Sequence, residues 1–234
     1  RAQPCDGCAT WIEGHLGDNE SLHRLVSGVD AVIHCAGTVR GASRDDFNHI
    51  NVDGVARLVN AAKRQQPTPR FLLISSLAAR EPHLSFYAAS KRQGEAALAE
   101  SAGTMPWLAL RPPAVYGPGD REMAPIFRLA SMGLAPIVGS GDNRLSLLFV
   151  NDLAEAIFKA LFQPEIDRAI FELHDGRMQG YNWNDVIEII SVLKGKRIRK
   201  VPISPRLLQL IGKANSKMAA VFGYAPMLTP EKLG

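Results

Sequence analysis

Cysteine is scarce in this sequence, and the three cysteines exclude two classes of protein. Cys5, Cys8 and Cys35 are too few for a disulfide framework in 234 residues, which favours a reducing compartment. Cys5 and Cys8 form a single Cys-x-x-Cys, whereas a zinc site needs a second pair of ligands. No matching Cys or His cluster follows, so no metal site is predicted.

Long apolar runs are also missing. No stretch approaches the ~18 residues that a membrane helix needs, and no signal-peptide pattern opens the chain. A hydrophobic content of 46% and a charged content of 21% are ordinary for a soluble globular protein. We therefore predict a cytoplasmic protein without a membrane partner.

The one dense basic run, Lys194 to Lys200, belongs to a chain whose net charge is only +4. The run lacks the interleaved aromatic residues of a nucleic-acid patch. It leads directly into Val201-Pro202-Ile203, so we interpret it as a solvated helix end followed by an edge strand. No nucleic-acid partner is predicted.

Short apolar runs alternate with helix-like segments along the chain. The strand candidates are Ala9–Glu13, Ala31–Cys35, Phe71–Ser75, Trp107–Arg111, Leu145–Phe149 and Ala169–Leu173. The helix candidates are Glu20–Val26, Asp45–Arg64, Phe86–Ser101, Asp152–Phe162 and Trp183–Leu193. Runs such as Leu72-Leu73-Ile74 are apolar throughout, as expected for strands that are covered on both faces. The alternation predicts an α/β fold with a doubly wound, Rossmann-like parallel sheet.

The second half of the chain is less regular. Proline and glycine are frequent between Pro112 and Asn143, where Met123–Met132 is helix-like, and a last helix is expected to begin near Ser204-Pro205. We interpret these segments as a smaller C-terminal lobe that binds substrate. Residues 1–115 would form a partial dinucleotide-binding core completed by 145–175, and residues 116–144 and 176–234 would form the lobe.

Tyr87 and Lys91 stand four residues apart in a predicted helix, so their side chains project from the same face. A nearby ammonium stabilises the phenolate and makes a tyrosine, which titrates near ~10 when free, usable as an acid or base. Ser75 and Ser76 end the preceding strand and bring a hydroxyl to the same place. These residues predict a proton-transfer site for alcohol or carbonyl chemistry. The alternative is a snorkelling lysine on an ordinary amphipathic helix.

Motifs around these residues follow one another in a fixed order. They are Val32-Ile33-His34-Cys35-Ala36-Gly37, Asn51-Val52-Asp53-Gly54, Ile74-Ser75-Ser76, Tyr87-Ala88-Ala89-Ser90-Lys91, Leu110-Arg111-Pro112-Pro113-Ala114-Val115-Tyr116-Gly117-Pro118 and Val150-Asn151-Asp152-Leu153-Ala154. Together they resemble the extended short-chain dehydrogenase/reductase family, in its NAD-dependent epimerase/dehydratase branch. Each motif is weak alone, but their order and spacing match over nearly the whole chain.

The resemblance implies an NAD(P)-dependent oxidoreductase or epimerase and gives catalytic roles to three residues. Tyr87 would exchange the proton on a substrate hydroxyl or carbonyl, and Lys91 would hold its phenolate and the nicotinamide ribose. Ser76 would bind the reacting oxygen, while the cofactor supplies or accepts hydride. Because adjacent strand residues point oppositely, we expect Ser75 to be a buried hydroxyl bonded to backbone.

The resemblance also implies further binding residues. Those expected to bind NAD or NADP are His15, Leu16, Cys35, Ala36, Gly37, Asn51, Tyr87, Lys91, Pro113, Ala114 and Val115. Asn51 would support the lysine or order a water. Arg144 could contact a substrate diphosphate, with a plain surface arginine as the alternative. Asp152 is interpreted as a helix cap. Leu77 and Ala78 stand where sugar 4,6-dehydratases carry an Asp-Glu pair, which argues against that subclass.

The sequence departs from the family at its beginning. The Gly-x-x-Gly-x-x-Gly turn that binds pyrophosphate is absent, and the chain starts near the expected third strand. We interpret the sequence as lacking the first βαβ segment, and therefore as a fragment truncated at its N-terminus. His15 stands where relatives commonly carry an aspartate for the adenine, and Asp18 is better placed to cap the next helix. These residues do not separate NAD from NADP.

Two functions stay open. The first is an enzyme that acts on a nucleotide sugar or on another small hydroxyl or ketone substrate. The second is a non-catalytic binding or scaffold protein of the same fold, which the missing phosphate turn favours. The intact set of Ser76, Tyr87 and Lys91 favours the enzyme. Relatives often pair through helices like Asp45–Arg64 and Phe86–Ser101, so a homodimer is expected.

Overall fold

A parallel four-stranded sheet lies at the centre of the computed structural model, which describes residues 9–120, 123–138 and 142–204. Its strands are β1 (Ala31–His34), β2 (Arg70–Ile74), β3 (Trp107–Arg111) and β7 (Ala169–Glu172), in the order β1-β2-β3-β7. Every neighbouring pair is parallel. The predicted Rossmann-like α/β fold is thereby confirmed. The predicted last helix and the Cys5–Cys8 pair lie outside the described residues.

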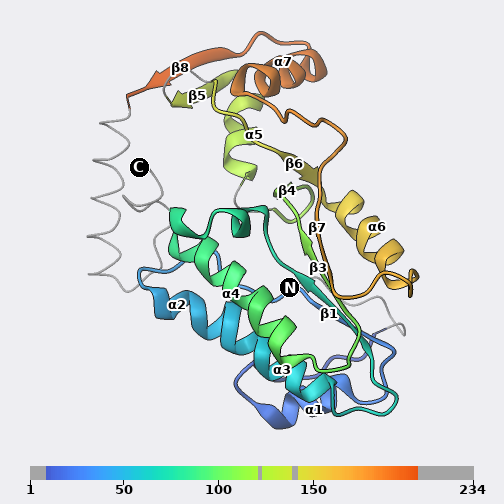
Figure 1. Cartoon of the computed structure of the whole chain (residues 1–234). Coiled ribbons are helices and arrows are strands. Elements are labelled where there is room, and N and C mark those ends of the chain that lie inside the picture. The colour runs from blue at the N-terminus through green and yellow to red at the C-terminus, as the bar shows by residue number, and fades with distance from the viewer. Residues whose placement is uncertain (1–8, 121–122, 139–141, 205–234) are drawn as a thin grey trace.

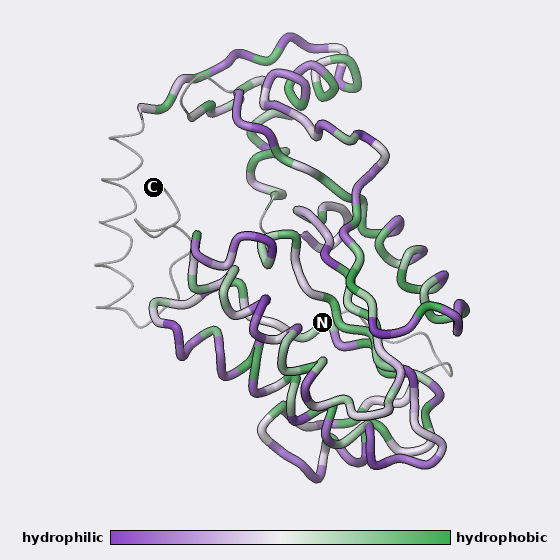
Figure 2. Tube along the Cα trace, in the orientation of Figure 1, coloured by the Kyte–Doolittle hydropathy of each residue, from purple (hydrophilic) through white to green (hydrophobic). Residues whose placement is uncertain are grey.

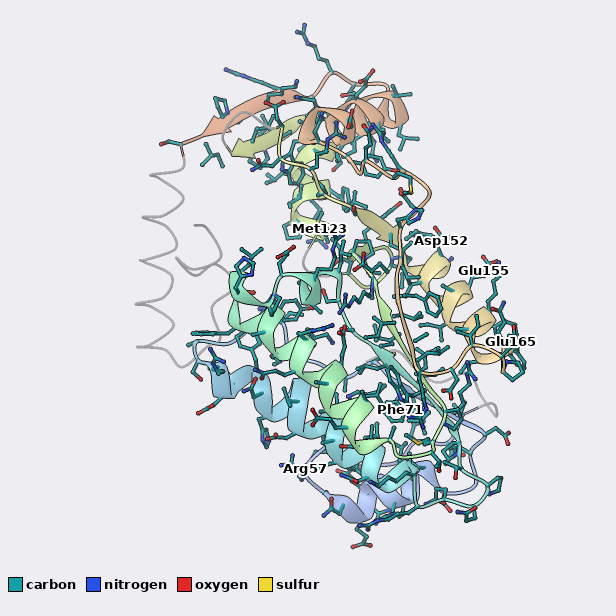
Figure 3. All side chains as sticks on the ribbon, viewed as in Figure 1. Arg57, Phe71, Met123, Asp152, Glu155 and Glu165 are labelled. Atoms are coloured by element: carbon teal, nitrogen blue, oxygen red, sulfur yellow. The ribbon has the colours of Figure 1, made fainter. Side chains whose placement is uncertain are left out.

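Helices cover both faces of this sheet (Figure 1). The helices α1 (Asn19–Val26), α3 (Gly54–Ala62) and α4 (Phe86–Ser101) lie on one side, and α6 (Val150–Leu161) lies on the other. The strands alternate between the two faces: Phe71 and Leu73 join the core beneath the first group, whereas Leu72 is fully buried but outside that cluster. Figure 3 shows Phe71 in this inner position. Hydrophobic residues accordingly follow the strands in Figure 2, and hydrophilic residues follow the outer turns of the helices.

The predicted helix Asp45–Arg64 is interrupted at its centre. It consists of α2 (Arg44–Asn48), a π-helical turn η1 (His49–Asp53) and then α3. Single π-helical turns inside α-helices are rare and are often found at functional sites. Upstream, the side chain of Asp18 accepts a hydrogen bond from the Glu20 amide and caps α1, which confirms the predicted role of Asp18.

A smaller lobe packs beyond the ends of the strands. It contains α5 (Ala124–Ser131), α7 (Trp183–Lys194), and a two-stranded parallel sheet of β5 (Leu134–Val138) and β8 (Arg199–Ile203). A second pair, β4 (Ala114–Tyr116) and β6 (Leu147–Phe149), connects it with the core. Met123, just before α5, lies where the lobe meets the core (Figure 3).

The basic run has the structure that the sequence predicts. The helix α7 ends at Lys194, and Gly195 follows in the left-handed conformation that ends many helices. The strand β8 then pairs with β5, and the described residues add no further strand to this sheet. Within the described ranges no helix is long and apolar enough to cross a membrane.

Three sequence predictions need correction. Residues 9–13 form no strand: they find no ladder partner among the described residues, and Trp11 is 73% exposed. Asp152 does not cap its helix, because α6 begins at Val150 after the N-cap Phe149; its carboxylate instead lies in the first turn, where the helix dipole favours it. The strands β4 and β5 were not predicted, because each is short and β5 contains Pro136.

Candidate active site

A cavity of about 920 Å³ opens at the carboxyl ends of β1, β2 and β3. Ligands of open α/β sheets bind at this edge. Of the predicted site residues, those that line the cavity are Cys35, Gly37, Ser76, Tyr87, Lys91, Pro113, Ala114, Val115 and Arg144. The fold therefore brings to one place most of the residues that the sequence assigns to catalysis and binding.

Ser76 and Tyr87 both line this cavity, and the Ser76 side chain is a hydrogen-bond partner of the Tyr87 phenol. Ser76 directly follows Ser75 at the end of β2, and its hydroxyl also accepts a hydrogen bond from the Ala78 amide at 3.2 Å, where it caps the turn η2 (Leu77–Arg80). Tyr87 lies in the first turn of α4, which Ser85 caps through the Ala88 amide. Local capping on both sides thus fixes the positions of the two hydroxyls.

Burial raises the pKa of Tyr87, and the hydrogen bond from Ser76 opposes that shift. The sequence had led us to expect a pKa lowered by the neighbouring lysine. In the structure the Lys91 ammonium instead donates to the Ile74 carbonyl at 2.8 Å. The phenol is therefore protonated at neutral pH, and it is ready to donate a proton rather than to accept one.

Lys91 lies one helical turn after Tyr87, and burial lowers the pKa of its ammonium to about 8, while Glu95 opposes the shift. An ammonium with this pKa stays mostly charged at neutral pH but loses its proton more easily than an exposed lysine does. Gly37 faces it: a Cβ at Gly37 would lie 3.6 Å from Lys91 Nζ and 3.2 Å from Asn51 Oδ1. The absence of a side chain at Gly37 keeps the space beside the ammonium open.

Asn51, in the π-helical turn η1, is buried and holds the loop after β1 in place. Its Oδ1 accepts from the Thr38 amide at 2.9 Å, and its Nδ2 donates to the Thr38 carbonyl at 3.0 Å. The same Nδ2 donates to Ser90 Oγ at 2.9 Å, and Ser90 donates to the Tyr87 carbonyl at 2.8 Å. Asn51 therefore links the cavity loop to the helix that carries Tyr87, and it does not line the cavity itself.

Gly94 allows this link by letting two backbones approach closely. A Cβ at Gly94 would lie 2.2 Å from the Asn51 carbonyl oxygen, which is far inside any real contact. Helix α4 can pack against η1 at this distance only because residue 94 has no side chain. The position of α4, and with it that of Tyr87 and Lys91, depends on this glycine.

A buried ion pair that was not predicted from the sequence lies behind the residues predicted to be catalytic. The Glu95 carboxylate, in a residue that is 2% exposed, accepts from Arg111 Nε at 2.8 Å and from Arg111 Nη2 at 2.7 Å. Ser75 donates to the same carboxylate at 2.5 Å, which corrects the prediction that its hydroxyl bonds backbone. The spacing of Glu95 four residues after Lys91, on the same helix face, was the available signal.

The remaining predicted cofactor residues lie elsewhere. His15 is exposed, and its Nδ1 accepts from the Gly17 amide at 3.1 Å. Leu16 packs against the core cluster of α1 and α3, close to Gly54. Ala36 belongs to the exposed turn after β1 but, unlike Cys35 and Gly37, does not line the cavity. Contact of His15, Leu16 and Ala36 with cofactor stays a prediction.

The residues present suit the nicotinamide half of a dinucleotide. Lys91 offers an ammonium for ribose hydroxyls, Gly37 leaves room beside it, and Pro113 and Val115 form an apolar wall. The pyrophosphate half has no such match here, because the sequence contains no Gly-x-x-Gly-x-x-Gly turn. The residues that line this cavity therefore suit the part of the cofactor that reacts.

Comparison with known proteins gives relatives of the same kind. The chain is 37% identical over 199 residues to a ceramide reductase of Caulobacter vibrioides, covering 85% of this chain and 59% of that protein. It is 31% identical over 171 residues to a 2-alkyl-3-oxoalkanoate reductase of Stenotrophomonas maltophilia, covering 64% of this chain and 51% of that protein. The chain thus spans little more than half the length of these two relatives.

Solved structures share the fold. A putative epimerase from Burkholderia cenocepacia superposes with a TM-score of 0.75 at 21% identity, over 88% of this chain and 74% of that one. The model of the NAD dependent epimerase/dehydratase family matches residues 1–172. That match covers most of the chain, confirms the predicted family and identifies a nicotinamide dinucleotide as the family's cofactor. The chain belongs to the NAD dependent epimerase/dehydratase family.

Proposed function

We propose that this chain carries the catalytic site of an NAD(P)-dependent reductase or dehydrogenase that converts a carbonyl and a hydroxyl group into each other. The observation that carries the proposal is the hydrogen bond between Ser76 and Tyr87, with Lys91 one turn away, in a cavity at the carboxyl ends of the strands. The relatives named as reductases support the same reaction class. This arrangement does not support the alternative function as a non-catalytic scaffold, because a scaffold does not need two neighbouring hydroxyl groups in a cavity.

In the reduction, the chain binds the carbonyl oxygen and delivers the proton. Ser76 donates a hydrogen bond to the carbonyl oxygen and holds it beside Tyr87. When bound, NAD(P)H supplies the hydride to the carbonyl carbon. Tyr87 gives its proton to the oxygen as negative charge develops there, and Lys91 stabilises the phenolate that remains. Water then returns the proton to Tyr87. The oxidation uses the same groups in reverse.

The raised pKa of Tyr87 suits this direction. A protonated phenol is the form that a reduction requires at neutral pH, and the charged Lys91 acts on the phenolate only after the proton has left. The Ser76 hydroxyl can donate its hydrogen bond to the substrate oxygen before proton transfer, or to the Tyr87 phenolate after it.

A second candidate is an epimerase that acts on a nucleotide sugar. Arg144 favours it, because its guanidinium lines the same cavity and could bind a diphosphate. That side chain is exposed and donates to the Gln179 carbonyl at 3.0 Å, which is also the behaviour of a surface arginine. Two further properties belong to the proposed function, whichever reaction the enzyme catalyses. We propose a cytoplasmic setting, which the scarcity of cysteine favours. We also propose that two copies pair through the segments 45–64 and 86–101.

The test is NAD(P)H oxidation by the full-length protein with a panel of ketones, aldehydes and nucleotide sugars. We expect turnover with at least one carbonyl compound, and a loss of about 10²-fold in kcat on Ser76→Ala, because one hydrogen bond to a developing oxyanion has this effect. Ser75→Ala is the matched control, since Ser75 also lines the cavity but its hydroxyl donates to the buried Glu95 carboxylate. Equal losses for both variants, with unchanged cofactor binding, would contradict the role of Ser76.

A further inference from the structure

A second cavity, of about 590 Å³, lies in the lobe between α5, α7 and the turn after β4. Its wall on the α7 side is a stripe of apolar side chains, Val186, Ile189, Ile190 and Leu193. These positions recur at the three- and four-residue spacing that places side chains on one face of a helix. Tyr116 and Phe127, whose rings lie 5.8 Å apart, close the opposite side.

Only part of the apolar stripe is used by the lobe's own core: Val186 is buried and Ile190 packs against the core cluster. Ile187 on another face of α7 packs with Ala130, Ala135, Ile137 and Ile198, and these residues form a separate buried cluster. A helix on the surface of a globular protein normally needs one apolar face. On α7, Ile189 and Leu193 stay 43% and 77% exposed, although they line the cavity. The outer part of the stripe, Ile189 and Leu193, is therefore available to a ligand.

The lobe cavity lies next to the active-site cavity. Ala114 and Val115 of β4 line the active site, and the next residue, Tyr116, lines the lobe cavity. Asp120 lines both. A linear ligand with its reacting carbon at Tyr87 can therefore extend past β4 into the lobe.

The lining of the lobe cavity also includes polar residues, among them Asp120 and Asp175. Asp175 accepts a hydrogen bond from the Tyr181 hydroxyl and another from the Arg177 amide, so its carboxylate is already engaged. Arg128 and Lys194, which also line the cavity, are exposed to solvent. The α7 stripe, Tyr116 and Phe127 offer a ligand hydrocarbon contacts.

We propose that this lobe cavity binds the linear hydrocarbon chain of the substrate, so that the enzyme acts on a carbonyl or hydroxyl group attached to a long alkyl chain. The inference rests on the proposed function, because it places the reacting carbon at Tyr87. A nucleotide, which needs polar partners for its base, is the competing occupant that the experiment below separates.

Methyl ketones from butanone to dodecanone, assayed with NAD(P)H and the full-length protein, test the proposal by chain length. Each CH₂ that enters the cavity should raise kcat/KM up to about fourfold, which corresponds to ~0.8 kcal/mol per buried CH₂. The increase should stop when the chain fills the cavity. A kcat/KM that does not change with chain length would overturn the inference, while turnover itself would leave the proposed function standing.

Two aspartate substitutions on α7 locate the effect. Ile189→Asp places a charge in the cavity, and we expect at least tenfold weaker turnover of dodecanone with no change for butanone. Val192→Asp is the matched control, because Val192 is 76% exposed on the same helix and does not line the cavity. Leu193→Asp, at a 77% exposed position that does line it, is a second variant if the first unfolds. Equal effects of the cavity and control substitutions would overturn the proposal.

Calorimetric binding of hexanol, octanol and decanol gives a readout that does not depend on turnover. Tighter binding of the longer alcohols, lost in Ile189→Asp but not in Val192→Asp, would support binding of a hydrocarbon chain in the lobe cavity. If no ketone were reduced at the same time, only the proposed function would be contradicted. Uridine diphosphate is the comparison ligand. Binding of this nucleotide that weakens in Ile189→Asp, with no chain-length effect for the alcohols, would assign the cavity to a nucleotide and overturn the inference.

Discussion

Gly94→Ala is the substitution that most sharply tests how α4 is positioned. The new Cβ would lie 2.2 Å from the Asn51 carbonyl oxygen, whereas real Cβ atoms essentially never approach closer than 3.0 Å. The two backbones must therefore separate by about 0.8 Å, the difference between these distances. Overpacking of this kind costs about 1–3 kcal/mol, and the better helix propensity of alanine returns up to ~1 kcal/mol.

The same shift should be visible in catalysis. A displacement approaching ~1 Å of catalytic groups can lower turnover about 10²-fold, and α4 carries both Tyr87 and Lys91. We expect Gly94→Ala to lose about 1–2 kcal/mol in urea unfolding and to lose most of its kcat, with cofactor affinity changed less. Gly94 would then be a positioning residue that acts through the helix.

Gly54→Ala is the matched control for this experiment. Gly54 is also helical, but the nearest atom to its added Cβ is Leu16 Cδ1 at 2.7 Å, the end of a flexible side chain that can move. This variant should keep its kcat. If Gly94→Ala were as stable and as active as Gly54→Ala, the close approach of α4 to η1 would not position the site, and the reasoning would be refuted.

Three further predictions concern buried charge. Burial lowers the pKa of His34 to about 4, so the folded protein holds this imidazole in its neutral form. The free energy of unfolding should therefore fall by about 3 kcal/mol as the pH drops from 6.5 to 4. His34→Leu should remove this acid dependence in urea titrations. Burial lowers the pKa of Lys91 to about 8, so between pH 8 and 10.5 only the unfolded chain still holds this proton. The free energy of unfolding of the wild type, relative to that of Lys91→Met, should therefore rise by about 3 kcal/mol over this range. A difference between the two proteins that does not change with pH would refute the shift. Glu95→Gln should cost about 3–5 kcal/mol by leaving Arg111 buried and poorly paired, whereas Glu20→Gln, in an exposed pair, should cost under ~1 kcal/mol.

The parts of the fold that follow from local signals were predictable from the sequence. The bounds of α4 and β3 agree with the prediction to the residue, because Ser85 caps the helix and an unbroken apolar run forms the strand. The identity of the cavity residues followed from the order of the motifs, with Cys35, Ser76 and Lys91 on three different elements.

The rest depended on partners that lie far away in the sequence. Residues 9–13 have the pattern of a strand but find no ladder among the described residues. The π-helical turn at Asn51 exists where that side chain reaches Thr38 and Ser90. The bond from Lys91 to the Ile74 carbonyl depends on how α4 lies against β2, and so does the burial that raises the pKa of Tyr87. The spacing of residues along the sequence does not predict such contacts between distant segments.

The single-turnover rate of hydride transfer in Tyr87→Phe tests the central claim most directly. The substitution removes only the hydroxyl that is hydrogen-bonded to Ser76 and keeps the ring beside Phe47, whose centroid lies 6.2 Å away. With saturating NAD(P)H and a reducible ketone, the rate should fall about 10²–10⁴-fold, the range for loss of a general acid, while the dissociation constant of NAD(P)H stays within about twofold. A wild-type rate in Tyr87→Phe would contradict the assignment of proton transfer to this tyrosine.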